Sequence, residues 1–174
     1  MPGVELKLVK LDGTVAEPGE EGEIRAKAPQ MMRGYLDSAL DADAFDEDGW
    51  FRTGDLGQQD ADGYLIITGR LKDIIIRNGE NIAPKEVEDL LVAHPDIAEI
   101  AIVGLPDART GERACAVIVA RGSAQPDVAS LRAFLDAKGV AKFKMPEQVA
   151  IWDALPKNEA GKVLKHQIRS VLVG

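Results

Sequence analysis

The sequence predicts an α+β fold in two parts: a β-rich first part, and a small second part with a mostly antiparallel sheet and flanking helices. Residues 1 to about 70 are rich in turns and lack a long amphipathic helix, whereas helical patterns recur after residue 84. The pattern changes at the charged stretch 70–73, which lies between two apolar segments. We therefore expect one domain at residues 1–71 and another at residues 72–174.

The first part shows the alternation of apolar and polar residues that is typical of half-buried strands. Asp12-Gly13 and Asp62-Gly63 supply the positive-φ positions of tight turns. A short helix is expected over 38–45, with Ser38 as its cap. The strands expected here cover residues 4–9, 23–26, 51–53, 56–59 and 64–68.

The second part alternates short apolar runs with amphipathic helical segments. Pro84 suits the first position of a helix, and Asp127 and Gly139 suit the start and the stop of the next one. We expect strands at 74–76, 97–105, 113–120 and 148–152, and helices at 84–93, 128–138 and 165–172.

Composition and charge narrow the possible partners. The chain has 174 residues, of which 45% are hydrophobic and 29% charged, as in an ordinary globular protein. Its net charge of −8 makes nucleic acid and anionic membrane poor electrostatic matches. No targeting segment or membrane-length apolar run is visible, and a single cysteine, Cys115, allows no internal disulfide. A reducing, cytoplasmic location is therefore expected.

Two charged positions near the domain boundary are candidate ligand contacts. Asp55, which we expect between two glycine-flanked turns, presents a carboxylate that can accept hydrogen bonds from a ribose diol. It can equally hold its own turn through the backbone. Arg70 can clamp a phosphate or a ribose. Alternatively, Arg70, Lys72 and Asp73 form a solvated linker, which is the usual role of a charge run.

A third candidate lies near the end of the chain, where Gly161-Lys162 falls in a flexible loop before a helix. A Gly-Lys pair in such a loop suggests phosphate binding. The segment is not a Walker A loop, because Val163 stands where a Ser or Thr would bind magnesium. Lys162 is thus either a cation delivered by a loop or an ordinary surface charge.

Four segments, taken in order, resemble the motifs of the adenylate-forming superfamily, which includes acyl-CoA synthetases, luciferases and nonribosomal-peptide adenylation domains. In the family reaction a carboxylate attacks the α-phosphate of ATP to give an acyl-adenylate and pyrophosphate. A thiol, usually that of coenzyme A, then displaces AMP. The similar segments are residues 22–24 with 32–36, residues 49–57, residues 69–88 and residues 155–165.

The resemblance implies a role for each candidate in the first half-reaction. Asp55 is expected to accept hydrogen bonds from the ribose hydroxyls of ATP and AMP, with Arg70 contacting the ribose or phosphate from the same side. Lys162 is expected to be the catalytic lysine of adenylate formation. An ammonium held in a water-poor site stabilises the negative charge that grows around the α-phosphorus.

The resemblance also implies a hinge and a thiol channel. Lys72 is expected at the hinge position, with Asp73 beside it. Gly79, with Glu80 and Asn81 on its loop, is expected to line the channel for the pantetheine arm. The hinge lets one small domain present first the lysine and then this loop.

Several parts of the family pattern are absent from the sequence. Nothing in the chain resembles the Thr/Ser/Gly-rich phosphate loop, the acyl pocket or the motif that carries the magnesium-binding acid. These lie upstream in family members. We therefore expect residues 1–71 to be the C-terminal, β-rich portion of a truncated N-terminal domain, and residues 72–174 to be the mobile lid. The missing N-terminal domain is then the main structural partner, and the chain alone is inactive.

The interpretation we favour is a carboxylic acid–CoA ligase for a fatty, aromatic or alicyclic acid, in the acyl-CoA synthetase or fatty-acid–CoA ligase branch. It would use ATP, Mg²⁺ bound outside this chain, coenzyme A and a small-molecule acid. The alternative within the family is an adenylation domain that loads a carrier-protein arm. Lys142 and Lys144 are basic, as a contact to the coenzyme A nucleotide requires, but Met145 and Glu147 interrupt them. Phe143 can stack on an adenine or belong to the core.

A second class of function is a non-catalytic binding module with the same fold. The presence of Asp55, Arg70 and Lys162 argues against it, because a pseudoenzyme tolerates their loss.

Overall fold

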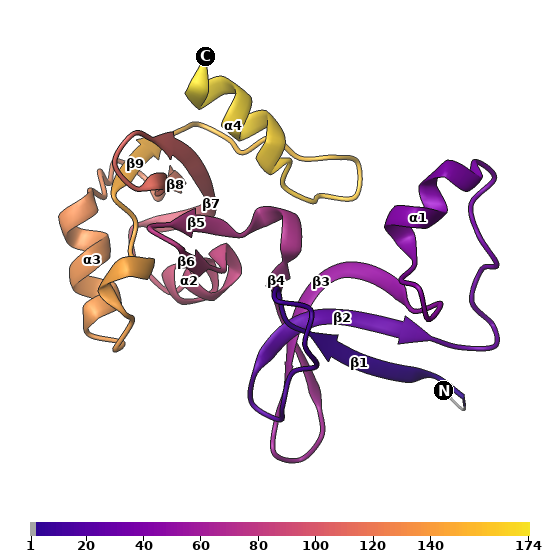
Figure 1. The fold of residues 1–174 in the computed structure, drawn as a ribbon. Coiled ribbons are helices and arrows are strands. Elements are labelled where there is room, and N and C mark those ends of the chain that lie inside the picture. Colours follow the sequence, from indigo (N-terminus) through magenta and orange to yellow (C-terminus); the bar gives the residue numbers. More distant parts are fainter. Residues whose placement is uncertain (1–2) are drawn as a thin grey trace. The chain divides into compact units, whose positions relative to one another are not determined.

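The computed structural model describes residues 3–174, which form two compact units (Figure 1). The first unit ends at Lys72 and the second begins at Asp73. The sequence placed this boundary one residue earlier, between residues 71 and 72. Each unit has its own sheet and its own buried residues.

The first unit is a four-stranded antiparallel sheet with the order β1-β2-β3-β4, so that each strand pairs with the next one along the chain. Between β2 and β3 lie a 3-10 turn, Ser38–Leu40, and the single-turn helix α1, Asp41–Ala44. The strands are β1 Glu5–Val9, β2 Glu21–Lys27, β3 Phe51–Gln59 and β4 Leu65–Arg70.

Two expectations for this unit were wrong. Residues 51–59 form one strand rather than two, because Gly54 adopts a positive φ of 69° and the register shifts between Leu56 and Gly57 without ending the sheet. Asp55 therefore lies within a strand and not between turns. The short helical segment is capped by Asp37 and not by Ser38, since the Asp37 carboxylate accepts from the Ala39 N–H at 3.0 Å.

The first unit is held by a small apolar core and a charged cluster around Asp46. The Asp46 carboxylate accepts hydrogen bonds from Arg25 Nη1 at 2.9 Å and from the Trp50 N–H at 2.8 Å, and pairs with Lys7 Nζ at 3.1 Å. Lys7 also lies over the Trp50 ring, 4.6 Å from its centroid. Asp46 thereby links the segment before β3 to both β1 and β2.

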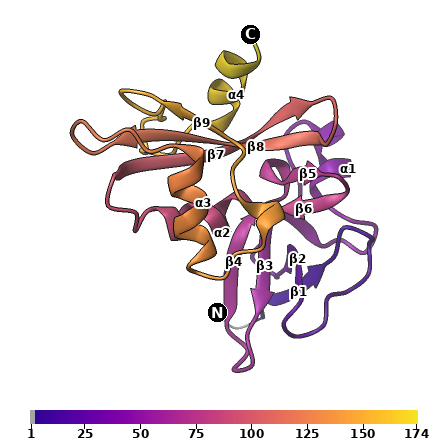
Figure 2. The same ribbon diagram turned by 90° about the vertical axis from the view of Figure 1, so that its left-hand side faces the viewer.

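The second unit is a five-stranded sheet in which β6, β5, β8 and β7 follow one another and β9 lies beside β8 (Figure 2). β7 and β8 form a long antiparallel hairpin, with Ile102 opposite Ala116. β9 runs parallel to β8, with Gln148 opposite Cys115, so the sheet is mostly antiparallel as predicted. The strands are β5 Ile75–Arg77, β6 Glu80–Ile82, β7 Ile97–Asp107, β8 Gly111–Ala120 and β9 Gln148–Ile151.

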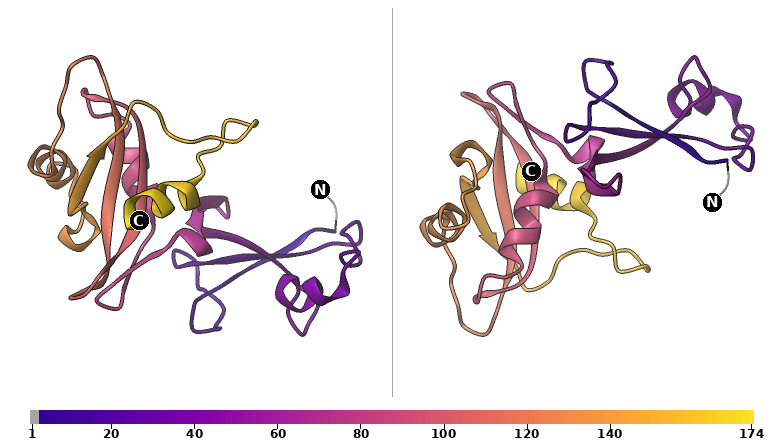
Figure 3. Two further views of the ribbon diagram at one scale, coloured as in Figure 1. Left: turned by 90° about the horizontal axis from the view of Figure 1, so that it is seen from above. Right: turned by 90° about the horizontal axis from the view of Figure 1, so that it is seen from below.

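Helices cover both faces of this sheet (Figure 3). The alternation of β8 decides which side chains meet which helices, because successive residues of a strand point to opposite faces. Ala116 and Ile118 pack with helices α2, Pro84–Leu91, and α3, Val128–Asp136. On the opposite face, Cys115 and Val117 pack with Ile168 of helix α4, Lys165–Val173. The α+β class is confirmed.

Local signals placed the helices correctly. Pro84 occupies the first turn of α2. Asp127 and Ser130 form a reciprocal capping box at the start of α3, in which Asp127 Oδ1 accepts from the Ser130 N–H at 2.8 Å. Within residues 3–174, no helix is both long enough and apolar enough to cross a membrane.

Cys115 is fully buried in the core of the second unit. Burial raises the pKa of its thiol to about 11, against a small opposing effect of Arg113. The thiol is therefore protonated at neutral pH and packs as a small apolar side chain.

Candidate functional site

The first unit brings Asp55 and Arg70 into contact. They face each other across β3 and β4, and Arg70 Nε lies 2.6 Å from Asp55 Oδ1. Their side chains are 29% and 39% exposed, so both remain accessible to a ligand. The solvated-linker alternative does not hold for Arg70, because its guanidinium is engaged by a specific carboxylate.

Backbone contacts hold the strand at Asp55. Thr53 Oγ1 accepts from the Asp55 N–H at 3.1 Å and donates to the Ile24 carbonyl of β2 at 2.7 Å. Leu56 is 2% exposed and anchors the next position in the core. Among residues 3–174 the Asp55 carboxylate contacts Arg70 and accepts no backbone hydrogen bond, so the turn-holding role considered for it is not observed. The sequence analysis gave Thr53 no role. It could have been predicted, because a hydroxyl two residues before Asp55 can accept the Asp55 N–H.

The predicted hinge residues form a short 3-10 turn, Leu71–Asp73, directly after β4. Lys72 is exposed and Asp73 is half-buried. The division between the two compact units falls between these two residues. The predicted hinge therefore lies outside the strands of both sheets.

Gly79 lies at the tip of the β5–β6 hairpin. Asn78 and Gly79 have φ values of 50° and 81°, which are those of a two-residue type I′ turn. Glu80 and Asn81 follow in β6, and all three predicted channel residues are exposed. A Cβ at Gly79 meets no atom within 4 Å, so within the described chain glycine is required by backbone conformation rather than by space.

Sequence reasoning missed strand β6, although an Asn-Gly pair between apolar residues is a strong hairpin signal. Contacts from outside the hairpin hold its base. Arg77 pairs with Glu147 through two bonds of 2.8 and 2.9 Å, and the Asn78 N–H donates to the Thr110 carbonyl at 2.8 Å. Glu147, which interrupts the basic stretch before β9, is therefore the partner of Arg77.

Lys162 lies on the segment between β9 and α4. Its side chain is exposed, and among residues 3–174 no carboxylate lies within 4.0 Å of its Nζ atom. The segment is more ordered than the sequence suggested. Lys157 and Val163 bridge across it, and the Asn158 N–H donates to the Lys162 carbonyl at 2.9 Å. Within the described chain, Lys162 is an unpaired ammonium on a hydrogen-bonded loop.

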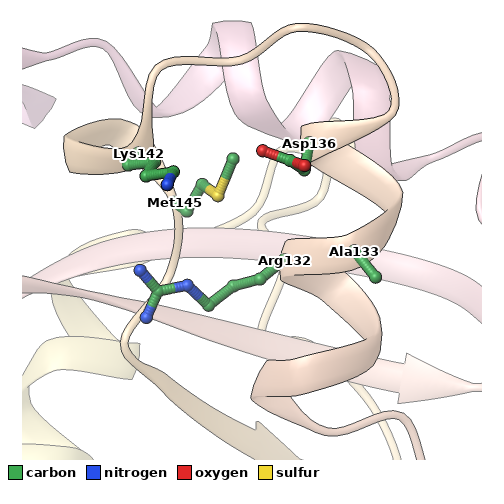
Figure 4. A pocket seen from close by; sticks show the side chains of 5 residues that line it. All are labelled: Arg132, Ala133, Asp136, Lys142 and Met145. Carbon is green, nitrogen blue, oxygen red and sulfur yellow. The ribbon is translucent and has the colours of Figure 1, made fainter.

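A pocket of about 350 Å³ lies between α3 and the 3-10 turn Lys142–Lys144 (Figure 4). Lys144 is paired with Glu86 of α2 at 2.7 Å, and Phe143 packs against the core, which is the structural one of its two expected roles. Lys142, unlike Lys144, forms no ion pair with a described residue, and it lines the pocket. The pocket is lined by Arg132, Ala133, Asp136, Lys142 and Met145.

The candidate residues fall into groups that each belong to one unit. Asp55 and Arg70 are in the first unit; the Gly79 turn and Lys162 are on separate loops of the second. In the part of the chain that the structure describes, no group of three or more His, Cys, Asp or Glu side chains could hold a metal ion.

Comparison with known proteins identifies the fold. Residues 86–162 match the family described as the AMP-binding enzyme C-terminal domain. The chain is 43% identical over 169 residues to the medium-chain fatty-acid–CoA ligase of Escherichia coli K12, covering 96% of this chain and 30% of that enzyme. It is also 43% identical over 168 residues to the salicyl-AMP ligase / salicyl-S-ArCP synthetase of Mycobacterium tuberculosis H37Rv, again covering 96% and 30%.

A solved structure agrees with these relatives. ATP-bound MatB from Rhodopseudomonas palustris matches 98% of this chain and 34% of its own with a TM-score of 0.89 and 39% identity. The chain belongs to the adenylate-forming superfamily and corresponds to the C-terminal part of its members. It spans about a third of the length of the relatives it matches.

Proposed function

We propose that this chain supplies the lysine, hinge and nucleotide-contacting acid of an ATP-dependent carboxylic acid–CoA ligase. The observation that carries the proposal is Lys162, an exposed ammonium that no described carboxylate pairs, on an ordered loop within a chain of this superfamily. A lysine held in this way has its charge available for a ligand. The relatives named above include a CoA ligase, and one solved relative binds ATP.

In the first half-reaction, an oxygen of the acid attacks the α-phosphorus of ATP and the bond to pyrophosphate breaks. Negative charge grows on the oxygens around that phosphorus. Lys162 is proposed to stabilise this charge, while Asp55 accepts the ribose hydroxyls and Arg70 both orients Asp55 and contacts the nucleotide. The 2.6 Å pair with Arg70 leaves the second Asp55 oxygen for the diol.

In the second half-reaction, the thiol sulfur attacks the acyl carbonyl and AMP leaves as the thioester forms. We propose that rotation at Lys72 and Asp73 replaces Lys162 with the Gly79 turn. The exposed turn, with Glu80 and Asn81 in β6, then lies along the pantetheine arm. The phosphate loop and the acid pocket belong to the remainder of the enzyme, so this chain alone is proposed to show no turnover.

The test is Lys162→Ala in the full-length enzyme. Carboxylate-dependent exchange between ATP and pyrophosphate is expected to fall a few hundredfold, about 3–4 kcal/mol, because one transition-state contact is lost. Lys85→Ala is the matched control, since Lys85 is an exposed lysine of α2 paired with Asp89. An unchanged exchange rate in Lys162→Ala would show that the lysine assignment is wrong.

A carrier-protein arm is the second candidate acceptor. The salicyl-S-ArCP synthetase of M. tuberculosis is as similar to this chain as the CoA ligase is. The pocket is lined by two cations, Arg132 and Lys142, and one carboxylate, Asp136. Its excess of positive charge favours free coenzyme A, whose nucleotide carries phosphates. Assays of thioester formation with coenzyme A and with a phosphopantetheinylated carrier protein distinguish the two acceptors. If coenzyme A is the acceptor, the double variant Arg132→Ala/Lys142→Ala is expected to raise KM for coenzyme A.

A further inference from the structure

The segment that carries Lys162 contains two more lysines, and both of them are neutralised. Lys157 Nζ lies 2.6 Å from a carboxylate oxygen of Glu99 in β7. Lys165 Nζ lies 2.8 Å from Glu88 of α2. Two of the three lysines in residues 157–165 therefore serve as attachments to the rest of the unit, and within the described chain Lys162 keeps its charge available.

The two attachments act at opposite ends of the loop and are supported by buried groups. Leu155, just before the loop, is 6% exposed, and Ile168 in the first turn of α4 is fully buried on the same face of the sheet. Glu88 also accepts the Ile102 N–H of β7 at 2.6 Å, so its carboxylate is itself fixed by the sheet edge. The loop therefore starts and ends at defined points.

Within the loop, one residue, Asn158, holds the backbone at Lys162 through its side chain and its own backbone. Asn158 Oδ1 accepts the Lys162 N–H at 2.8 Å. The Asn158 backbone adds two bonds, donating to the Lys162 carbonyl at 2.9 Å and accepting from the Gly161 N–H at 2.9 Å. The neighbouring Glu159 side chain makes no hydrogen bond with any described residue. Asn158 thus holds both backbone groups of Lys162.

We propose that Asn158 is a positioning residue for Lys162, acting in a loop whose ends are fixed by the Lys157–Glu99 and Lys165–Glu88 pairs. The lysine side chain is long and flexible, so the volume its ammonium searches depends on where its Cα–Cβ bond points. Fixing the Lys162 N–H and carbonyl fixes that direction. A displacement of about 1 Å at a reacting centre costs about a hundredfold in rate. The proposal rests on the proposed function of Lys162.

The experiment compares Asn158→Ala with Lys162→Ala in the full-length enzyme. Asn158→Ala is expected to lower kcat of ATP–pyrophosphate exchange about tenfold to a hundredfold, with little change in KM for ATP. Formation of thioester from preformed acyl-adenylate is expected to be unchanged, since that half-reaction does not use Lys162. Asn158→Asp, which keeps a side-chain oxygen acceptor at the same place, is expected to restore most of the exchange rate.

Glu159→Ala is the matched control in the same loop and is expected to leave the exchange rate unchanged. A second readout uses the chain itself: amide hydrogen exchange at Lys162 is expected to speed up in Asn158→Ala while Tm stays the same. The proposal is overturned if Lys162→Ala abolishes exchange but Asn158→Ala does not reduce it, or if Asn158→Ala slows both half-reactions equally. If Lys162→Ala has no effect, it is the proposed function that fails.

Discussion

At the residue scale, the Asp55–Arg70 pair is better suited to recognition than to stability. Both side chains are partly exposed, and an ion pair in that setting contributes on the order of 0–1 kcal/mol to folding. The ion pair with Arg70 occupies one carboxylate oxygen of Asp55 and leaves the other available to a ligand. The residues that support it, Thr53 and Leu56, lie on the same strand and make the placement rigid.

Asp55→Asn tests this role. The variant keeps the shape but removes the charge that strengthens hydrogen bonds from the ribose hydroxyls, each worth about 1.5–3 kcal/mol when the acceptor is charged. KM for ATP in the full-length enzyme is expected to rise about tenfold to a hundredfold, with Tm nearly constant. Asp62→Asn, in the exposed β3–β4 turn, is the control. An unchanged KM for ATP would show that Asp55 does not contact the nucleotide.

Asp46 gives a prediction about pH and stability. Burial raises the pKa of its carboxyl, but hydrogen bonds from the Trp50 N–H, Arg25 and Lys7 more than offset this and lower the pKa from 3.8 to about 2. A lowered folded-state pKa contributes stability that is present above about pH 3.8 and lost as pH falls through about 2. The contribution is on the order of 1–2 kcal/mol after allowance for solvent screening.

Asp46→Asn is therefore expected to lower the free energy of unfolding near pH 7, and the difference from the parent should shrink as pH falls from about 4 toward about 2. Urea titrations at several pH values, followed by Trp50 fluorescence in a Trp152→Phe background, measure this directly. A difference that stays constant over that whole range would contradict the assignment of the stabilising charge to Asp46.

At the element scale, the β5–β6 hairpin depends on the backbone conformation of its turn, and the proposed contact with the thiol arm can be tested there. Gly79→Ala introduces a side chain into open space but at a φ of 81°, which costs about 1–2 kcal/mol for an L-residue. The variant is expected to slow thioester formation from acyl-adenylate at least about tenfold while changing ATP–pyrophosphate exchange little. The two half-reactions are assayed separately.

Gly122→Ala is a closely matched control for the hairpin prediction. Gly122 also has a positive φ, 59°, and also has no atom within 4 Å of an added Cβ, but it lies in the turn after β8. If both variants slow thioester formation equally, the effect comes from general destabilisation and the Gly79 turn does not contact the thiol arm.

At the scale of the whole molecule, the prediction concerns the junction between the two units. Lys72→Pro fixes one φ angle at about −65°, which restricts rotation at the junction between the units. One half-reaction is expected to slow at least about tenfold relative to the other, because each needs its own orientation. Lys72→Ala, which leaves the backbone free, is the control. If Lys72→Pro changes the rates of both half-reactions by the same factor, the hinge lies elsewhere.

Local signals predicted the helices well and the short strands less well. Asp127, Ser130 and Gly139 mark α3 because capping depends on neighbours within a few residues. Gly54 suggested a break in β3, but cross-strand pairing with β2 and β4 carries the strand through it. β6, with three residues, is too short for an alternation pattern to be recognised.

The α+β class, most of the helices and strands, the resemblance to the superfamily and the position of Lys162 in a loop before the last helix could all be predicted from the sequence. Three contacts between distant segments could not: the Asp55–Arg70 pair, the Arg77–Glu147 pair, and the attachment of the lysine loop by two ion pairs. The difference lies in how far apart along the chain the interacting residues are. Turns, caps and alternation follow from adjacent residues, whereas these contacts depend on strand register and on how helices pack against a sheet built from distant segments.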